Sequence, residues 1–172
     1  FMKRGINTKC LHLEDEEGCF DNYGSLSYPI YQTATYAHPA VGESTGYDYS
    51  RLQNPTREHL EKIVAALEDG IDAIALSSGM AAITLLMEIF KPGDHVIVDS
   101  DLYGGSIRLF SNVSEKNNIT FSRVDCHKEK VEAYITENTK AIYIETPTNP
   151  MMNVTDIEAM AKIAHERGLL LI

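Results

Sequence analysis

Hydrophobic residues are distributed differently on the two sides of residue 54. Before it no hydrophobic period is sustained, whereas after it stretches with a helical period alternate with short apolar runs rich in β-branched residues. The first periodic stretch begins at Pro55, and its apolar residues fall at i, i+3, i+4 and i+7 on one face: Leu60, Ile63, Val64 and Leu67. Asn54 or Thr56 can cap its start and Gly70 is a stop signal, so this stretch predicts an amphipathic helix.

Predicted helices and strands alternate through the rest of the chain. The short apolar runs predict strands over residues 72–77, 95–99, 119–124, 140–145 and 169–172. The stretches between them predict helices over residues 79–90, 104–117, 128–137 and 155–167. Each helix is long enough for a crossover connection, so we predict an α/β fold with a mostly parallel sheet and helices on both faces.

Residues 1–54 read as an N-terminal arm that precedes this α/β domain of residues 55–172. The arm is rich in Gly, Ser, Thr and Tyr, and six of the nine tyrosines precede residue 50. Such a segment is either extended and packed on another surface or partly disordered. The tyrosines favour the packed arm, because each can bury a large apolar area and still keep one polar contact.

Composition and charge narrow the class of protein. The 172 residues carry a net charge of −10, which disfavours nucleic acid as a partner, since phosphate backbones need a surplus of Lys and Arg. No apolar run approaches the roughly 20 residues of a membrane helix, and no signal peptide is visible. The three cysteines, Cys10, Cys19 and Cys126, lack metal-type spacing, and their odd number suggests reduced thiols. We therefore expect a cytoplasmic protein without membrane, nucleic acid or metal as partner.

The junction between the strand 72–77 and the next helix is a candidate phosphate site. Ser78-Gly79-Met80 runs directly from strand to helix, where free N–H groups and the positive end of the helix dipole suit an anion. Gly79 would let that anion approach the backbone closely. A plain tight turn that packs the helix on the sheet is the alternative.

Three further residues stand where a ligand could be contacted, because ligands of open parallel sheets bind at the carboxyl ends of strands. Tyr103 follows the strand 95–99 and could lie against a flat ligand or move a proton, or simply cover the edge of the core. Asn149 stands between two prolines after the strand 140–145 and could meet a ligand oxygen or belong to a structural turn. Arg51 in the arm suits a phosphate, although a lone surface arginine is usually just solvated.

The combination of these motifs resembles the Cys/Met-metabolism family of pyridoxal-phosphate-dependent enzymes. The resemblance rests on four motifs in this order: Tyr49-Ser50-Arg51 with Asn54-Pro55-Thr56, the run Ser78 to Ile83, the run Asp101 to Gly105, and the run Glu145 to Pro150. Residues 42–49 and 103–110 look most like the bacterial cystathionine γ-synthases and O-acetylhomoserine thiolyases of this family. The resemblance implies the first part of the large, three-layer, mostly parallel-sheet domain of fold-type I enzymes, preceded by an extended arm.

The same resemblance assigns roles to individual residues. It implies that Ser78, Gly79 and the backbone of Met80 hold the phosphate of pyridoxal 5'-phosphate. Tyr103 would stack on the cofactor ring and help activate the substrate amine, and Asn149 would contact the side of the ring that carries the hydroxyl.

Other roles implied by the resemblance lie at a subunit interface or toward the substrate. Tyr49 and Arg51 would reach the phosphate from a neighbouring subunit, so a homo-oligomer, either a dimer or a homotetramer, is implied. Arg108 would contact the distal end of an amino-acid substrate.

The reaction implied is a trans-sulfuration step of methionine biosynthesis or cysteine metabolism. It is a γ-replacement on an O-acylhomoserine by cysteine or sulfide, which gives cystathionine or homocysteine. Cystathionine β-lyase, cystathionine γ-lyase and methionine γ-lyase are the alternatives. Gly105 stands where methionine γ-lyases typically carry cysteine, which disfavours the last of these.

The family's Schiff-base lysine has no counterpart among these 172 residues. None of the nine lysines lies at a matching motif. In the family, the aspartate that pairs with the pyridine nitrogen belongs to a Val-Asp-Asn-Thr segment that comes after the strand of residues 169–172, and these 172 residues do not include that segment. These 172 residues alone are therefore expected to be inactive, and a non-catalytic truncated fragment is an alternative of a different class. A nicotinamide-dependent oxidoreductase is disfavoured, because no dinucleotide fingerprint is present.

Overall fold

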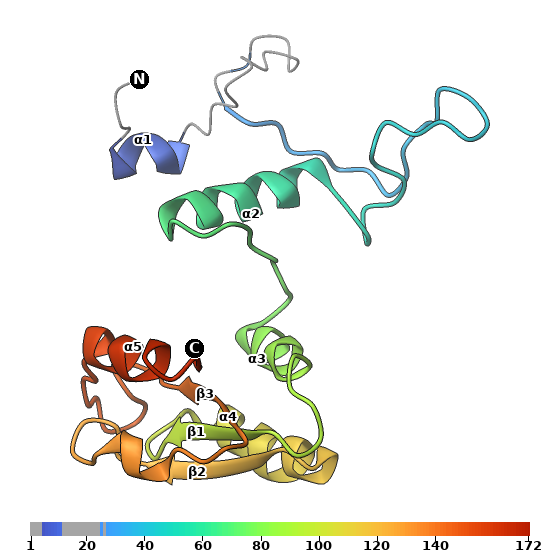
Figure 1. Cartoon of the computed structure of the whole chain (residues 1–172). Coiled ribbons are helices and arrows are strands. Elements are labelled where there is room, and N and C mark those ends of the chain that lie inside the picture. Colours follow the sequence, from blue (N-terminus) through green and yellow to red (C-terminus); the bar gives the residue numbers. More distant parts are fainter. Residues whose placement is uncertain (1–4, 12–24, 26) are drawn as a thin grey trace. The chain divides into compact units, whose positions relative to one another are not determined.

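Two units make up the computed structural model, which describes residues 5–11, 25 and 27–172. They are Phe1–Leu76 and Ser77–Ile172, and each is described here by itself (Figure 1). The predicted arm and the first predicted helix thus belong to the same unit.

Helix α2 (Pro55–Leu67) organises the first unit and confirms the helix predicted there. The Asn54 side chain caps it by accepting from the Thr56 N–H at 2.9 Å, and proline occupies the first helical position, where a missing N–H costs nothing. At the other end Asp69 adopts a φ of 50°, and the Gly70 N–H donates to the Ala65 carbonyl at 2.8 Å. The helix therefore stops where the glycine predicted it.

The described part of the arm packs beside α2 through polar and aromatic contacts. A short helix, α1 (Ile6–Leu11), which the sequence pattern did not predict, is tied to α2 because Lys9 Nζ donates to the Ala66 carbonyl at 2.7 Å. Further along, the Tyr28 ring stacks on His59 with centroids 3.9 Å apart. The Tyr47 hydroxyl donates to the Glu58 carboxylate. For the residues that the structure describes, these contacts favour a packed arm over a partly disordered one.

The strand predicted over residues 72–77 is wrong. This segment forms no strand pair among the described residues, and its apolar side chains Ile74 and Leu76 are exposed, as is Ile71 just before it. An apolar run becomes a strand only where a neighbour exchanges backbone hydrogen bonds with it, and the sequence pattern shows the run but not the neighbour.

A parallel sheet of four strands forms the second unit, as predicted. The strands are β1 (His95–Asp99), β2 (Thr120–Val124), β3 (Thr139–Tyr143) and β4 (Leu170–Leu171), in the spatial order β2-β1-β3-β4. All pairs are parallel, and all five residues of β1, one of the two inner strands, are buried. Burial on both faces explains why β1 reads as a continuous apolar run rather than an alternating one.

Helices cover both faces of this sheet and create a three-layer arrangement. The first is α3 (Gly79–Met87), followed by α4 (Gly104–Leu109) with the π-helical and 3₁₀ turns η1 (Phe110–Ser114) and η2 (Glu115–Asn117). The last is α5 (Ile157–His165), which begins at its cap Asp156. Figure 1 shows α5 (red) alongside the strands.

The alternation of side chains along β1 divides the core into two clusters. Val96 and Val98 pack with residues of α3, α4 and η1, whereas Ile97 packs with residues of α5. The same alternation places Tyr143 of β3 in the first cluster and Ile142 in the second. The carboxyl ends of β1 and β3, where the predicted ligand residues follow, are thereby held in one rigid layer.

The helix predicted over residues 128–137 is also wrong, since only the single 3₁₀ turn η3 (Val131–Tyr134) forms there. Glu129 folds back, and its carboxylate accepts from the Asp125 N–H at 3.1 Å. Lys130 then takes an extended conformation that brings Val131, 1% exposed, onto the core. Burial of one valine and a local turn outweigh the modest helical propensity of this charged stretch.

His95 gives the second unit a pH-dependent stability. It is 7% exposed, Nδ1 lies 2.7 Å from Thr139 Oγ1, and Nε2 lies 3.0 Å from Ser122 Oγ. Burial lowers its pKa, so the ring is neutral in the folded state and protonates more readily when unfolded. Stability is therefore full above the ordinary histidine pKa of about 6.5 and falls as the pH drops below it, by at most about 1.4 kcal/mol per pH unit.

This slope is measured by urea unfolding at several pH values between about 5 and 8. His95→Asn should flatten the slope, whereas His165→Gln, at an exposed position, should leave it unchanged. Equal slopes for the protein and for His95→Asn would show that other groups carry the pH dependence.

Candidate active site

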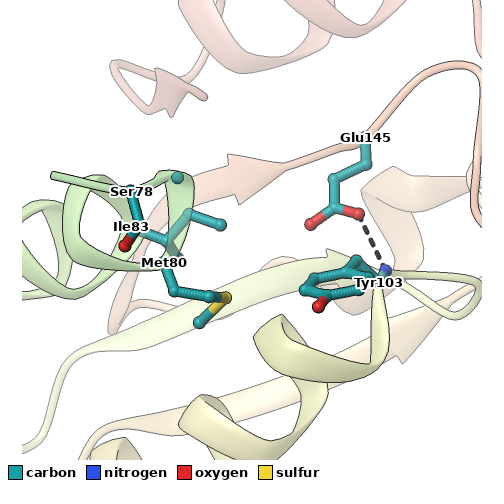
Figure 2. A pocket seen from close by; sticks show the side chains of 6 residues that line it. Ser78, Met80, Ile83, Tyr103 and Glu145 are labelled. Atoms are coloured by element: carbon teal, nitrogen blue, oxygen red, sulfur yellow. Dashed lines mark hydrogen bonds between the residues drawn. The ribbon is translucent and has the colours of Figure 1, made fainter. Parts of the chain in front are cut away.

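A pocket of about 420 Å³ opens in the second unit, where β1 and β3 end. Its lining residues come from three segments far apart in the sequence: Ser78, Gly79, Met80, Ile83, Tyr103 and Glu145. Figure 2 shows the residues of α3 on one side and Tyr103 with Glu145 on the other. The structure thus brings together four of the predicted site residues, Ser78, Gly79, Met80 and Tyr103, at the expected edge of the sheet.

The N-terminus of α3 supplies the donors on one side of the pocket. Ser78 is its cap, and the Ser78 Oγ accepts from the Ala81 N–H at 3.1 Å. The first backbone bond of the helix runs from the Ala82 N–H to the Ser78 carbonyl, so the N–H groups of Gly79 and Met80 have no acceptor within the helix. A Cβ placed on Gly79 would meet nothing within 4 Å, which leaves room for an anion beside these donors.

Tyr103 forms the opposite side of the pocket. It is the residue at the N-cap position of α4, and it is 47% exposed. Its ring lies against Gly105 so closely that a Cβ on this glycine would stand 2.4 Å from Tyr103 Cε1 and 2.7 Å from Met80 Sδ. Because Gly105 has no side chain, the Tyr103 ring and the Met80 side chain can lie directly against it.

Glu145 lines the pocket but was not among the predicted site residues. Its carboxylate accepts from the Tyr103 N–H at 2.8 Å, from Ser106 Oγ at 2.6 Å and from the Tyr143 hydroxyl at 3.0 Å. Burial, with the nearby Glu145 charge and the hydrogen bond to it, raises the pKa of Tyr143 well above its ordinary value, so this hydroxyl stays a donor. The one signal in the sequence was that Glu145 is the last residue of the strand predicted over residues 140–145.

Asn149 is exposed and does not line the pocket. Its loop is nevertheless held to the Tyr103 segment by Asp101, which accepts from Thr148 Oγ1 and, at 3.1 Å, from the Met151 N–H. The loop is closed on itself by the Thr148 N–H, which donates to the Asn153 carbonyl at 2.9 Å. The role predicted for Asn149 remains a prediction.

The remaining predicted residues also lie outside the pocket lining. Arg108 is exposed on α4, and its Nη1 lies 3.3 Å from where a Cβ on Gly104 would be. Tyr49 and Arg51 belong to the first unit, where the Arg51 guanidinium carbon is 5.0 Å from the centre of the Tyr49 ring. Their predicted approach to a phosphate on another subunit stays a prediction.

The pocket fits a flat, phosphorylated cofactor such as pyridoxal phosphate. Two backbone donors with open space beside them suit the phosphate, and an exposed aromatic ring suits a planar heterocycle. Its volume lies within the range of about 300–1,000 Å³ that is typical of small-molecule sites.

The part of the chain that the structure describes offers neither a metal site nor a membrane-spanning helix. No group of three or more His, Cys, Asp or Glu side chains is placed there to hold a metal ion. None of the helices in those residue ranges is long and apolar enough to span a bilayer.

Comparison with known proteins agrees with the fit of the pocket to pyridoxal phosphate. The family model described as "Cys/Met metabolism PLP-dependent enzyme" matches residues 7–172. The chain is 52% identical over 99% of its length to a cystathionine gamma-synthase/O-acetylhomoserine (thiol)-lyase of Bacillus subtilis, of which it covers 46%. It is 51% identical over 87% of its length to a cystathionine gamma-lyase of the same organism, of which it covers 40%.

A solved structure shares the fold. The cystathionine gamma-lyase from Lactobacillus plantarum, in complex with L-serine, superposes with a TM-score of 0.86 at 40% identity. The match covers 98% of this chain and 44% of that one. The chain thus spans less than half the length of each of these three relatives.

Proposed function

Because the chain belongs to the family of pyridoxal-phosphate-dependent enzymes of cysteine and methionine metabolism, we propose that it is the N-terminal part of a trans-sulfuration enzyme. The whole protein replaces the γ-substituent of an O-acylhomoserine with cysteine or sulfide, giving cystathionine or homocysteine. The observation that carries this proposal is the pocket in which the free N–H groups of α3 face Tyr103 across the carboxyl ends of the strands. The similarity to a γ-synthase and thiolyase of Bacillus subtilis supports the choice of reaction.

In this proposal the N-terminus of α3 holds the phosphate. The N–H groups of Gly79 and Met80 donate to it, and the helix dipole favours its negative charge. Ser78 keeps the first turn of the helix in place because its side chain satisfies the Ala81 N–H. Pyridoxal phosphate, when bound, supplies the electron withdrawal that labilises bonds at the α-carbon of an amino acid.

Tyr103 acts on the ring side of the pocket. Its aromatic face orients the flat cofactor, and its hydroxyl can hold or move a proton at the substrate amine. Met80 and Ile83 supply apolar walls to this space.

Substitution Tyr103→Phe is expected to keep the stacking on the cofactor ring and to remove the hydroxyl that can hold or move a proton. Turnover by the whole protein should fall by about 10²-fold or more, the usual contribution of a positioned acid or base, while the dissociation constant of the cofactor changes less than about threefold. Steady-state kinetics and a cofactor titration measure the two quantities. Tyr134→Phe removes a hydroxyl from another exposed tyrosine and should change neither. Full activity in Tyr103→Phe would leave the ring as a packing element only.

A cystathionine lyase is the second candidate, because the chain is almost as similar to a γ-lyase of Bacillus subtilis as to the γ-synthase and thiolyase. Two assays of the whole protein separate the candidates. The first mixture contains O-acetylhomoserine together with cysteine or sulfide, and the second contains cystathionine alone. Formation of cystathionine or homocysteine from the first mixture supports the proposal. Breakdown of cystathionine without a γ-replacement activity would assign the protein to the lyases.

We also propose that Arg51 contacts the phosphate bound by Gly79 of a neighbouring subunit in a homo-oligomer. Arg51→Ala removes a charged hydrogen bond worth about 1.5–3 kcal/mol, so cofactor affinity should fall by about 10- to 150-fold. Arg167→Ala, which removes an exposed arginine from the end of α5, is the matched control and should bind normally.

Mixed oligomers test whether the site is shared. Subunits carrying Arg51→Ala are mixed with subunits carrying Gly79→Asp. If each site takes Arg51 from one subunit and Gly79 from the other, some sites of the mixed oligomers contain both residues intact. Recovery of cofactor binding in the mixture supports a shared site. Absence of recovery, with mixed oligomers shown by mass spectrometry, would place both residues in one subunit's own site.

A further inference from the structure

The N-terminus of α4 is held by a side chain from a different element. Tyr103 occupies the N-cap position of this helix but makes no side-chain capping bond. The first N–H groups of a helix need acceptors, and here Glu145, two residues beyond the end of β3, accepts from the Tyr103 N–H at 2.8 Å. Figure 2 marks this bond.

We propose that Glu145 is a positioning residue, which fixes Tyr103 in the pocket by capping α4 from the end of β3. This inference rests on the proposed function for the part that Tyr103 plays in the reaction. It concerns a residue that acts through Tyr103 rather than on the substrate.

The carboxylate of Glu145 is itself fixed from two other directions. One oxygen accepts from Tyr103, while the other accepts from Ser106 Oγ at 2.6 Å and from the Tyr143 hydroxyl at 3.0 Å. Ser106 is fully buried, and Tyr143 is 5% exposed with its ring edge-on to Phe110 at 5.4 Å. Because both donors are anchored in the core, the carboxylate cannot swing away without breaking bonds to buried groups.

Glu145 holds the side of the Tyr103 backbone that the helix does not. The Tyr103 carbonyl accepts from the Ile107 N–H of α4 at 3.1 Å, whereas its N–H is held by Glu145, and its side chain is 47% exposed. An acidic side chain is moreover an unfavourable neighbour for a pocket that receives an anion. Its presence in the lining is explained by the three donors it gathers rather than by contact with the phosphate.

The decisive variant is Glu145→Leu, which keeps a side chain of similar length but removes both acceptor oxygens. A glutamine would not serve, because its amide oxygen could still accept from the Tyr103 N–H while its NH₂ donates to the hydroxyls of Ser106 and Tyr143. The matched control is Glu137→Leu, which makes the same change at an exposed glutamate just before β3. Hydrogen exchange of the Tyr103 amide is measured in the whole protein without cofactor, so the readout does not depend on activity.

In Glu145→Leu we expect the amides of residues 103–106 to exchange about tenfold faster or more, with the rest of the second unit unchanged. In the loaded protein, kcat should fall by about tenfold or more with a smaller change in KM, and the visible circular dichroism of the cofactor should weaken. Glu137→Leu should behave as the unaltered protein in all three measurements. If Glu145→Leu does not fold, Tyr143→Phe releases one anchor of the carboxylate and should give a smaller change of the same kind.

Two results would overturn the proposal. Unchanged exchange at Tyr103 would mean that Glu145 does not hold it, whatever happens to turnover. Faster exchange throughout Ser77–Ile172 would mean a general structural role. If the whole protein bound no cofactor, the proposed function would fail, but the exchange experiment would still decide whether Glu145 positions Tyr103.

Discussion

Substitution Gly105→Ala is expected to lower the activity by moving the Tyr103 ring while leaving the sheet intact. Since methionine γ-lyases typically carry cysteine at this position, the loss measures how far the Tyr103 ring of this protein depends on the space at Gly105. A Cβ at this position would stand 2.4 Å from Tyr103 Cε1 and 2.7 Å from Met80 Sδ, distances that side chains cannot tolerate. Since Gly105 is buried in α4, the backbone has little room to shift, and the Tyr103 ring must leave its place in the pocket. We expect kcat/KM to fall by about 10²-fold or more, because misplacement of a reacting group by about 1 Å can cost that much.

The neighbouring glycine provides the matched control for this experiment. A Cβ on Gly104 would meet only Arg108 Nη1, at 3.3 Å, and this side chain is exposed and can move. Gly104→Ala should therefore retain most of the activity and gain slightly in helix stability. Kinetics of the two variants, with their circular dichroism spectra, make the comparison. Comparable activity of the two variants would show that Tyr103 tolerates displacement and is not critical.

The sequence predicted the elements that depend on local patterns. Strand β1 and the helix from Pro55 were predicted correctly because strand burial and helix capping depend on residues that are close together in the sequence. Ser78, Gly79 and Tyr103 were found for a related reason, since strands of a parallel sheet end at one edge and ligands bind there.

The parts that were missed depend on contacts between distant residues. Glu145 binds the backbone N–H of Tyr103, 42 residues away, and a backbone donor carries no signature in the sequence. The segment 72–77 reads as a strand but lacks a pairing neighbour among the described residues. Lys130 stands in a stretch with helical composition, yet the burial of Val131 after it decides the local fold. Tertiary contacts of this kind override local propensity.

Substitution Gly79→Asp is expected to abolish cofactor binding without harming the fold. A side chain at this position enters open space beside the free N–H groups of α3, where the phosphate is proposed to lie. Two unit charges about 4 Å apart repel by about 4 kcal/mol at an effective dielectric constant of 20, which corresponds to roughly a thousandfold loss of affinity. The same carboxylate at the first position of a helix is favourable to the dipole by about 0.3–1 kcal/mol, so the folded state should be as stable or slightly more stable.

The opposite signs of these two effects make the experiment selective. Cofactor affinity is measured by titration of the whole protein, and stability by urea unfolding without cofactor. Gly79→Asn matches the size of the aspartate without its charge and should lose the steric part of the effect only, while Gly79→Ala should lose least. An aspartate variant that binds as tightly as the asparagine variant would show that no anion lies at this helix terminus, and the phosphate would have to be held elsewhere.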